Sequence, residues 1–179
     1  MAVSQNTNMI PWNAKDSWQE VNASMADHIE RVLGTNDSAF HLARRIKTQY
    51  ECLFPPMDDL CANTCLDCPD PCCPGAKIWF DFKDLIFLHL NRLPVPPAQP
   101  IENWQAVCRY LGSHGCNLPR LSRPWICTWY LCPAQTFSLD GSRNSGRGTV
   151  KDALQQIKKN RIELEREFIN IILPHREKS

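Results

Sequence analysis

Cysteine is the residue type whose number and spacing point to chemistry in this chain of 179 residues. The sequence contains ten cysteines but only seven glycines, and all but one of the cysteines fall in two blocks. The first block spans thirteen residues and contains Cys61, Cys65, Cys68, Cys72 and Cys73. The second block contains Cys108, Cys116, Cys127 and Cys132. Thiolates prefer Zn(II), Cu(I) and iron–sulfur centres to hard cations, so the two blocks together predict a metal site.

The spacing within the first block favours more than one metal ion. Cys65 and Cys68 have the short separation that lets two sulfurs reach one metal. The adjacent Cys72 and Cys73 point to opposite sides of an extended backbone, and would therefore serve different metals or clusters. One tetrahedral zinc ion uses four ligands, fewer than the two blocks offer. We therefore expect a multinuclear site or two neighbouring sites. An iron–sulfur cluster, [4Fe–4S], is the preferred cofactor and Zn²⁺ the alternative.

Arginines in the second block are candidates for stabilising this negative centre. A zinc ion or a [4Fe–4S] centre held by four thiolates has a net charge of about −2. We expect Arg123 and Arg109 near the metal, whereas Arg120 and His114 are expected to be ordinary surface residues, with a role as an additional metal ligand as the alternative for His114. Arg123 precedes Pro124, which favours an extended backbone at Arg123. Its guanidinium is expected to donate to a cluster-bound sulfur or to a loop carbonyl.

Helices on both sides of the cysteine blocks must position them. Apolar residues at helical spacing predict helices over 17–33, 38–54, 81–93 and 149–173. Pro55 and Pro56 are expected to end the second helix, with Cys52 as a small buried hydrophobe within it. The segments 57–76 and 138–148 are expected to be loops, 93–100 a stiff extended linker, and 101–135 compact but irregular. Asp81 and Asp84 have the spacing of a helix cap.

The predicted fold class is mainly α, with a small helical domain wrapped around an irregular, cysteine-rich, metal-binding middle segment. We expect one domain over 1–179, because single domains commonly contain roughly 100–200 residues. Its parts are the N-terminal helices (1–56), the cysteine-cluster region (57–135) and the C-terminal helix (149–174).

Composition excludes several classes of function. Lys and Arg number 20, Asp and Glu 19, and the formal net charge is +1, which does not favour binding to nucleic acid or to an anionic membrane. No apolar run approaches the roughly 18–20 residues of a membrane span. The first residues lack the pattern of a secretory signal, so we expect a cytoplasmic protein. Disulfides are the less favoured use of the cysteines, because the cytosol keeps thiols reduced.

Several of these motifs resemble the YkgJ-type cysteine-cluster family, also described as the CxxCxxCC zinc- or iron-chelating domain. The resemblance covers roughly residues 61–133. Its motifs here are Cys72-Cys73, Phe82-Lys83-Asp84-Leu85, Cys108-Arg-Tyr-Leu111, Gly115-Cys116, Arg123-Pro124-Trp125-Ile126-Cys127 and Cys132-Pro133. The resemblance implies that these cysteines chelate zinc or iron. The first block has five cysteines where the family run usually has four, and Cys61 is our choice for the additional one.

Three functions are compatible with these residues. The first is a helical iron–sulfur protein for electron transfer, sensing or partner docking. The second is a structural zinc protein that acts as an interaction module. The third is an accessory or catalytic component of an iron–sulfur-dependent modification enzyme. Cys61, Cys65 and Cys68 have the spacing of a radical-SAM cluster loop, but Asp67 replaces the usual aromatic residue and no αβ repeats follow. We predict no catalytic residue.

The C-terminal helix contains more apolar residues than one contact needs. Its main stripe, interrupted by Arg161, comprises Val150, Leu154, Ile157, Leu164, Phe168 and Ile171. We expect this stripe to pack on the N-terminal helices. A second set comprises Ile162, Ile169, Ile172 and Leu173. This second set suggests a homodimer or a docked protein or redox partner at the same helix.

Overall fold

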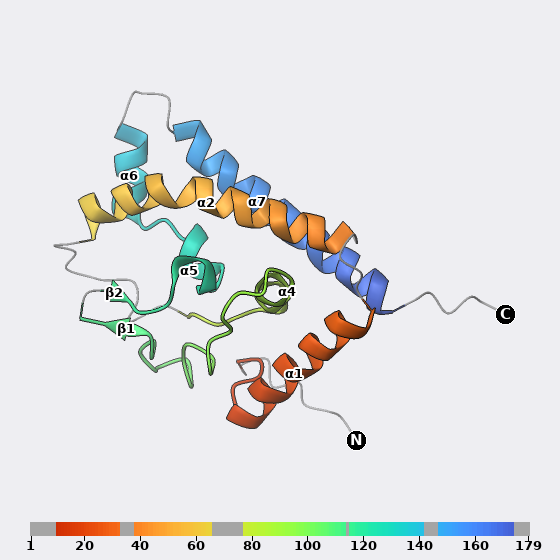
Figure 1. The fold of residues 1–179 in the computed structure, drawn as a ribbon. Helices are drawn as coiled ribbons and strands as arrows, with labels where there is room; N and C mark the ends of the chain where they lie inside the picture. The colour runs from red at the N-terminus through yellow and green to blue at the C-terminus, as the bar shows by residue number, and fades with distance from the viewer. Residues whose placement is uncertain (1–9, 33–37, 66–76, 114, 142–146, 174–179) are drawn as a thin grey trace, which may run out of the picture.

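The computed structural model describes residues 10–32, 38–65, 77–113, 115–141 and 147–173, and the mainly α fold predicted from the sequence is confirmed. The elements in chain order (Figure 1) are α1 (Lys15–Val32), α2 (Ser38–Thr64), α4 (Phe82–Leu90), β1 (Leu111–Gly112), β2 (Gly115–Cys116), the 3₁₀ helix η1 (Arg120–Ser122), α5 (Ile126–Trp129), α6 (Pro133–Gly141) and α7 (Arg147–Ile172). No helix in these ranges combines the length and apolarity needed to cross a membrane.

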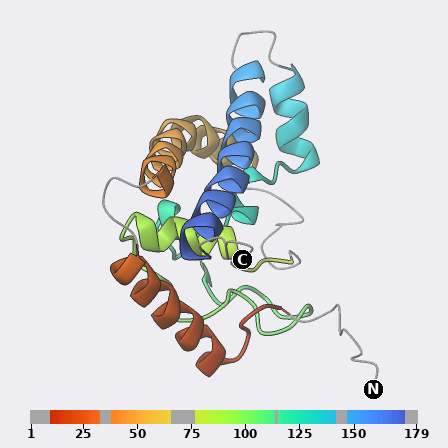
Figure 2. The same ribbon diagram turned by 90° about the vertical axis from the view of Figure 1, so that its right-hand side faces the viewer.

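Helices α2 and α7 pack side by side and run across the upper side of the molecule in Figures 1 and 2. Helix α4 packs against both of them, and α1 covers the other side of α4. The buried side chains where these helices meet include Ile46, Tyr50, Leu53, Leu85, Ile86, Leu88, Ile157, Leu164 and Phe168. Each fully buried side chain of this size contributes roughly 1.5–3 kcal/mol, so the interhelical core dominates the stability of the fold.

The C-terminal helix forms as predicted, with its main apolar stripe packed on the core. It begins at Arg147, two residues before the expected start, and α6 extends to Gly141. The predicted loop over 138–148 is therefore wrong at both ends, and its residues 142–146 lie outside the described ranges. The second apolar set is largely exposed at Ile162, Ile169 and Leu173. Association through this surface stays a prediction.

Helix α2 continues through Pro55 and Pro56 to Thr64, so the predicted end at the prolines and the predicted loop from residue 57 are wrong. Each proline removes one backbone donor from the helix, at a cost of about 3 kcal/mol. Burial of Met57 and Leu60 beyond the prolines offsets this cost, because the apolar stripe of α2 continues through them. This extension places Cys61 on a helix.

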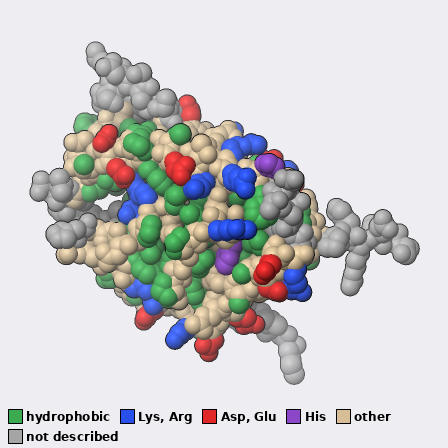
Figure 3. Space-filling view, in the orientation of Figure 1, with side chains coloured by type: hydrophobic (Ala, Val, Ile, Leu, Met, Phe, Trp, Pro, Cys, Tyr) green, Lys and Arg blue, Asp and Glu red, His purple; other side chains and the backbone are tan. Residues whose placement is uncertain are grey.

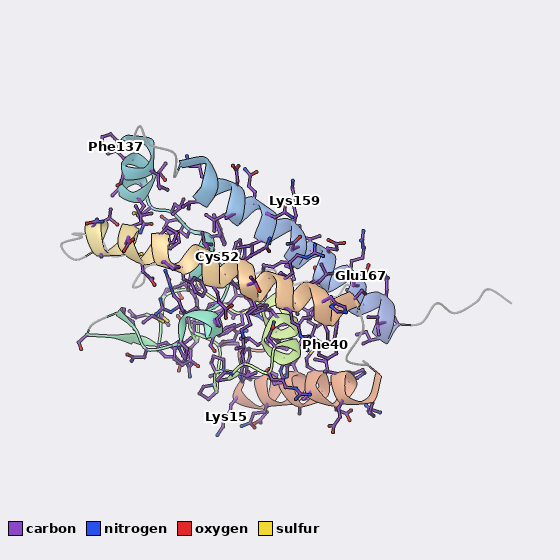
Figure 4. All side chains as sticks on the ribbon, turned by 45° about the horizontal axis from the view of Figure 1, so that its top comes forward. Lys15, Phe40, Cys52, Phe137, Lys159 and Glu167 are labelled. Carbon is purple, nitrogen blue, oxygen red and sulfur yellow. The ribbon has the colours of Figure 1, made fainter. Side chains whose placement is uncertain are left out.

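Cys52 lies on α2 with an exposed side chain (Figure 4), which contradicts its predicted burial. The buried positions around it are Tyr50, Leu53 and Phe54. At about 100° per residue, this spacing leaves Cys52 on the outer side of the helix. Its thiol is thus separate from the cysteines of the two blocks.

Helix α4 begins with the predicted capping box. The backbone N–H of Asp84 donates to Asp81 Oδ1 at 2.8 Å, and that of Asp81 donates to Asp84 Oδ2 at 3.0 Å. The helix ends at Leu90, earlier than expected, in a Schellman motif. The N–H groups of Arg92 and Leu93 donate to the carbonyls of His89 and Leu88, at 3.0 and 2.9 Å. Arg92 adopts a φ of 51° there.

Replacing Arg92 by glycine is expected to stabilise the protein by about 1 kcal/mol. The left-handed conformation costs a residue with a Cβ roughly 1–2 kcal/mol, and part of this gain is lost because glycine is more flexible when unfolded. Urea denaturation of both proteins measures the difference. As a control, Arg45→Gly at an exposed position within α2 is expected to destabilise by about 1 kcal/mol. Destabilisation by Arg92→Gly would contradict the argument.

The linker over 93–100 contains no helix or strand, as predicted, and it is packed into the fold. The indole N–H of Trp18 on α1 donates to the carbonyl of Pro96 at 2.8 Å. The buried amide of Gln99 accepts from Phe80 N–H at 2.8 Å and donates to the carbonyl of Pro11, also at 2.8 Å. These bonds fix the start of the segment that carries the second cysteine block.

Candidate metal centre

Three cysteines from both blocks meet around one buried glutamine. Cys61 lies in the last turn of α2, and the N–H of Cys65 donates to its carbonyl at 2.8 Å, so both side chains lie on one side of the helix end. Gln135 Nε2 lies 3.4 Å from Cys61 Sγ and 3.7 Å from Cys65 Sγ. Helix α6, which carries Gln135, packs against α2. This packing brings Gln135 to Cys61 and Cys65, which lie 74 and 70 positions earlier in the chain.

The third cysteine, Cys132, forms the N-cap of α6. Its sulfur accepts the N–H of Gln135 at 3.5 Å, and the side-chain oxygen of Gln135 accepts the N–H of Cys132 at 3.3 Å. This reciprocal pair is a capping box, and Pro133 occupies the first helical position. Gln135 is only 5% exposed, and it donates toward three sulfurs. We call Cys61, Cys65 and Cys132 the first thiol set.

Arg120 supplies positive charge beside the first thiol set. Burial and the neighbouring Cys65 raise the pKa of the Cys61 thiol, and Arg120 opposes this rise. The Arg120 guanidinium pairs with Asp58 at 2.6 Å and lies 5.2 Å from the centre of the Phe54 ring. Its side chain is 18% exposed, so the prediction of an ordinary surface residue is wrong. Asp58 holds it in place from the part of α2 beyond the prolines.

The second thiol set comprises Cys108, Cys116 and Cys127. Strands β1 and β2 pair antiparallel, with Leu111 opposite Cys116. The N–H of Leu111 donates to the carbonyl of Cys108 at 3.1 Å, which ties Cys108 to the same hairpin. Gly115 in this hairpin has a φ of 105°, a conformation that favours glycine. Cys127 lies on α5, where its N–H donates to the carbonyl of Pro124 at 2.9 Å.

Burial and mutual repulsion disfavour the thiolate form in the second set. Burial raises the pKa of the Cys127 thiol, and the thiolates of Cys116 and Cys108 raise it further. Burial also raises the pKa of Cys108, with Cys116 as an additional cause. Buried thiolates that repel one another are stabilised by a bound cation, because the cation replaces repulsion with attraction. The electrostatics of this set are therefore suited to a metal.

The two arginines predicted near the metal make different contacts. Arg123 Nε donates to the carbonyl of Leu118 at 3.1 Å, and Nη2 to the carbonyl of Cys116 at 3.4 Å. The Arg123 guanidinium was expected to donate to a cluster-bound sulfur or to a loop carbonyl, and in the structure it donates to loop carbonyls. Arg109 pairs instead with Glu102 at 3.1 Å and is exposed. Arg123 thus holds the backbone of one cysteine of the second set, whereas Arg109 contacts a carboxylate.

A buried charge network connects the second set to the helical core. The N–H of Trp125, two residues before Cys127, donates to Asp84 Oδ1 at 3.0 Å. Arg161 on α7 pairs with both Asp81 and Asp84 at 2.9 Å, and Arg161 Cζ lies 5.4 Å from the centre of the Trp125 ring. Arg161 is 1% exposed. The residue that interrupts the apolar stripe of α7 therefore positions the segment carrying Cys127.

The thiols of the two sets are donors that suit a soft metal. In this structure their sulfurs do not have the arrangement of a metal site. Each set provides three thiols, and the seven cysteines that the structure describes are all free. Within the described ranges, no three His, Cys, Asp or Glu side chains are placed to hold one metal ion. Ligation by either set therefore requires reorientation of side chains. The predicted ligands Cys68, Cys72 and Cys73, and also His114, lie outside the described residues.

Two residues of the site, Gln135 and Arg120, were not expected from the sequence. The segment Cys132-Pro-Ala-Gln135 contains the signal for Gln135, because proline at the first helical position and glutamine at the third indicate a helix start. Arg120 had no such signal, since its partners depend on α2 continuing past the prolines.

Comparisons with known proteins found no matching family model, no matching curated protein and no matching solved structure. The resemblance to the cysteine-cluster family accordingly depends on the motifs quoted from the sequence.

Proposed function

We propose that this protein holds an iron–sulfur cluster, or clusters, through cysteine thiolates and uses it for electron transfer, sensing or partner docking. The observation that supports this best is the buried residue Gln135. Its side-chain amide donates toward the sulfurs of Cys61 and Cys65, and its backbone N–H donates to the sulfur of Cys132. Hydrogen bonds to ligand sulfurs orient the ligands and tune cluster potentials. A side-chain amide that donates toward two sulfurs stabilises them when they carry negative charge.

The described ligands would be the two thiol sets, and Cys68, Cys72 and Cys73 stay predicted ligands from the sequence. When bound, the cluster would supply one-electron chemistry. Arg120 offsets negative charge beside Cys61, and Arg123 fixes the carbonyl of Cys116. Free thiols suit a reducing compartment, so we propose the cytoplasm as the location.

Metal and sulfide analysis of the full chain tests this function. Protein purified without oxygen is expected to be brown, with a broad visible absorption band, bound iron and acid-labile sulfide. Colourless protein with stoichiometric zinc would instead identify a structural zinc protein, the alternative interaction module. Protein that binds neither metal would overturn metal binding altogether.

Gln135→Leu is expected to weaken metal affinity by about 10–100-fold, the usual effect of losing a residue that supports the ligands. Leucine is similar in size to glutamine but lacks the amide donor toward Cys61 and Cys65, whereas the backbone N–H that faces Cys132 is unchanged. Competition with a chelator, followed by the visible absorption or by metal release, measures the affinity. Gln105→Leu at an exposed loop position is the matched control. Equal affinity in Gln135→Leu and wild type would show that this amide does not support a metal.

A further inference from the structure

A positively charged hollow lies between α2 and α4, and none of its lining residues belongs to either thiol set. Its volume is about 550 Å³, and it is lined by Phe40, Arg44, Lys47, Thr48, Glu51, Leu90, Asn91 and Arg92. Three cationic side chains and one carboxylate give the lining a net charge of +2. Figure 3 shows Lys and Arg side chains gathered where the N-terminal half of α2 passes above α4.

Two of the three cations in the lining are available to a ligand. Lys47 lies 3.6 Å from Glu51, one turn along α2. Within the described part of the chain, the guanidinium groups of Arg44 and Arg92 form no ion pair and no hydrogen bond. Guanidinium groups bind phosphate and carboxylate oxygens through paired N–H donors. The hollow therefore offers two such groups that pair with no carboxylate within the described ranges.

The backbone at Arg92 gives an independent indication of function. Arg92 has a φ of 51° in the Schellman motif that ends α4, a position where glycine is the usual residue. A strained residue is often retained where its side chain has a function. At this position the side chain lines the charged hollow, so the unfavourable conformation brings a cation to it.

The rest of the lining is suited to an organic group. Phe40 is half-buried on α2 (Figure 4), and Leu90 is buried at the end of α4. Thr48 adds a hydroxyl group. An apolar surface beside two free guanidinium groups can hold a molecule with one anionic and one hydrocarbon end. A phosphate monoester has a charge of about −1.5 to −2 at pH 7, which matches the net charge of the lining.

We propose that this hollow binds a small organic phosphate. Its phosphate group is held by Arg44 and Arg92, and its hydrocarbon part rests on Phe40 and Leu90. The proposal is independent of metal binding, because none of the lining residues belongs to either thiol set.

Calorimetric titration of the full chain with phenyl phosphate tests the proposal. We expect binding of one molecule per chain, weaker binding of inorganic phosphate, and no binding of phenol. Arg44→Gln and Arg92→Gly are each expected to weaken phenyl phosphate binding by about tenfold or more, the effect of losing a charge-assisted hydrogen bond. Arg92→Gly is also expected to stabilise the fold, so urea denaturation of this variant distinguishes a loss of binding from unfolding.

Arg45→Gln is the matched control, because Arg45 is an exposed neighbour on α2 that does not line the hollow. It should bind phenyl phosphate as the wild type does. The proposal is overturned if phenyl phosphate does not bind at millimolar concentration, if Arg92→Gly keeps the wild-type affinity, or if Arg45→Gln loses as much as Arg44→Gln. Equal affinity for inorganic and phenyl phosphate would overturn the role assigned to Phe40 and Leu90.

Discussion

Arg161→Met is expected to lower the free energy of unfolding by about 3–5 kcal/mol, as is typical when one partner is removed from a buried ion pair. Arg161 is almost completely buried and contacts Asp81 and Asp84, each at 2.9 Å. Methionine fills a similar volume but leaves the Asp84 carboxylate buried without its countercharge. Urea denaturation of the wild type and the variant measures the loss.

The loss is expected to depend on pH. Burial raises the pKa of Asp84 to about 6, and Arg161 opposes that rise, so the pKa is higher still without Arg161. A folded-state pKa above the unfolded value means that the folded protein binds more protons between those values, and its stability then falls as pH rises. The deficit of Arg161→Met should therefore be larger at pH 8 than at pH 5.

Arg166→Met is the matched control on the same helix. Arg166 is mostly exposed, and its contacts with Glu163 and Glu167 are 3.9 and 3.6 Å long. Exposed pairs of this kind contribute about 0–1 kcal/mol, so the control should lose no more than that. A loss in Arg161→Met no larger than in the control would show that the buried network does not hold α4 and α7 together.

Removal of metal is expected to accelerate amide hydrogen exchange by at least about a hundredfold in the segment with β1, β2 and α5, because bound metal supplies folding free energy. This segment has two strands of two residues each and a helix of four residues. Its attachment to the core includes the bond from Trp125 to Asp84. Bonds from a metal to the sulfurs of Cys108, Cys116 and Cys127 would join the hairpin to α5.

Helix α7 provides the internal reference for that experiment. Its buried residues Ile157, Leu164 and Phe168 pack on α2 and α4, so its exchange should change little when a chelator removes the metal. Similar exchange rates in the segment with β1, β2 and α5, before and after chelation, would show that metal does not organise it.

The parts of the fold that depend on local sequence could be predicted. Helix α7 has a long apolar stripe at helical spacing, and the start of α4 has a capping box in four consecutive residues. Each can be read from one continuous stretch of the sequence, without knowledge of what it packs against. Soft-metal ligation by the cysteines depends on equally local information, the number of thiols in a short segment, and it stays a prediction.

The parts that depend on distant packing could not be predicted. Pro55 and Pro56 are strong local signals for a helix end, and only burial of Met57 and Leu60 against the rest of the molecule outweighs them. The first thiol set requires this extension, because it brings Cys61 to α6. Cys127 and Cys132 are only five residues apart, yet they belong to different thiol sets. Spacing along the chain could not predict that Cys132 joins Cys61 and Cys65 around Gln135.

The most direct test of the central claim is the metal content per chain of Cys127→Ser and Cys132→Ser, purified without oxygen beside the wild type. Cys127 belongs to the second thiol set and Cys132 to the first, so each variant is expected to lose bound metal. Cys52→Ser, which replaces the exposed thiol outside both sets, should keep the wild-type content. If both variants kept as much metal as Cys52→Ser, or if the wild type contained none, the assignment of these cysteines as metal ligands would be contradicted.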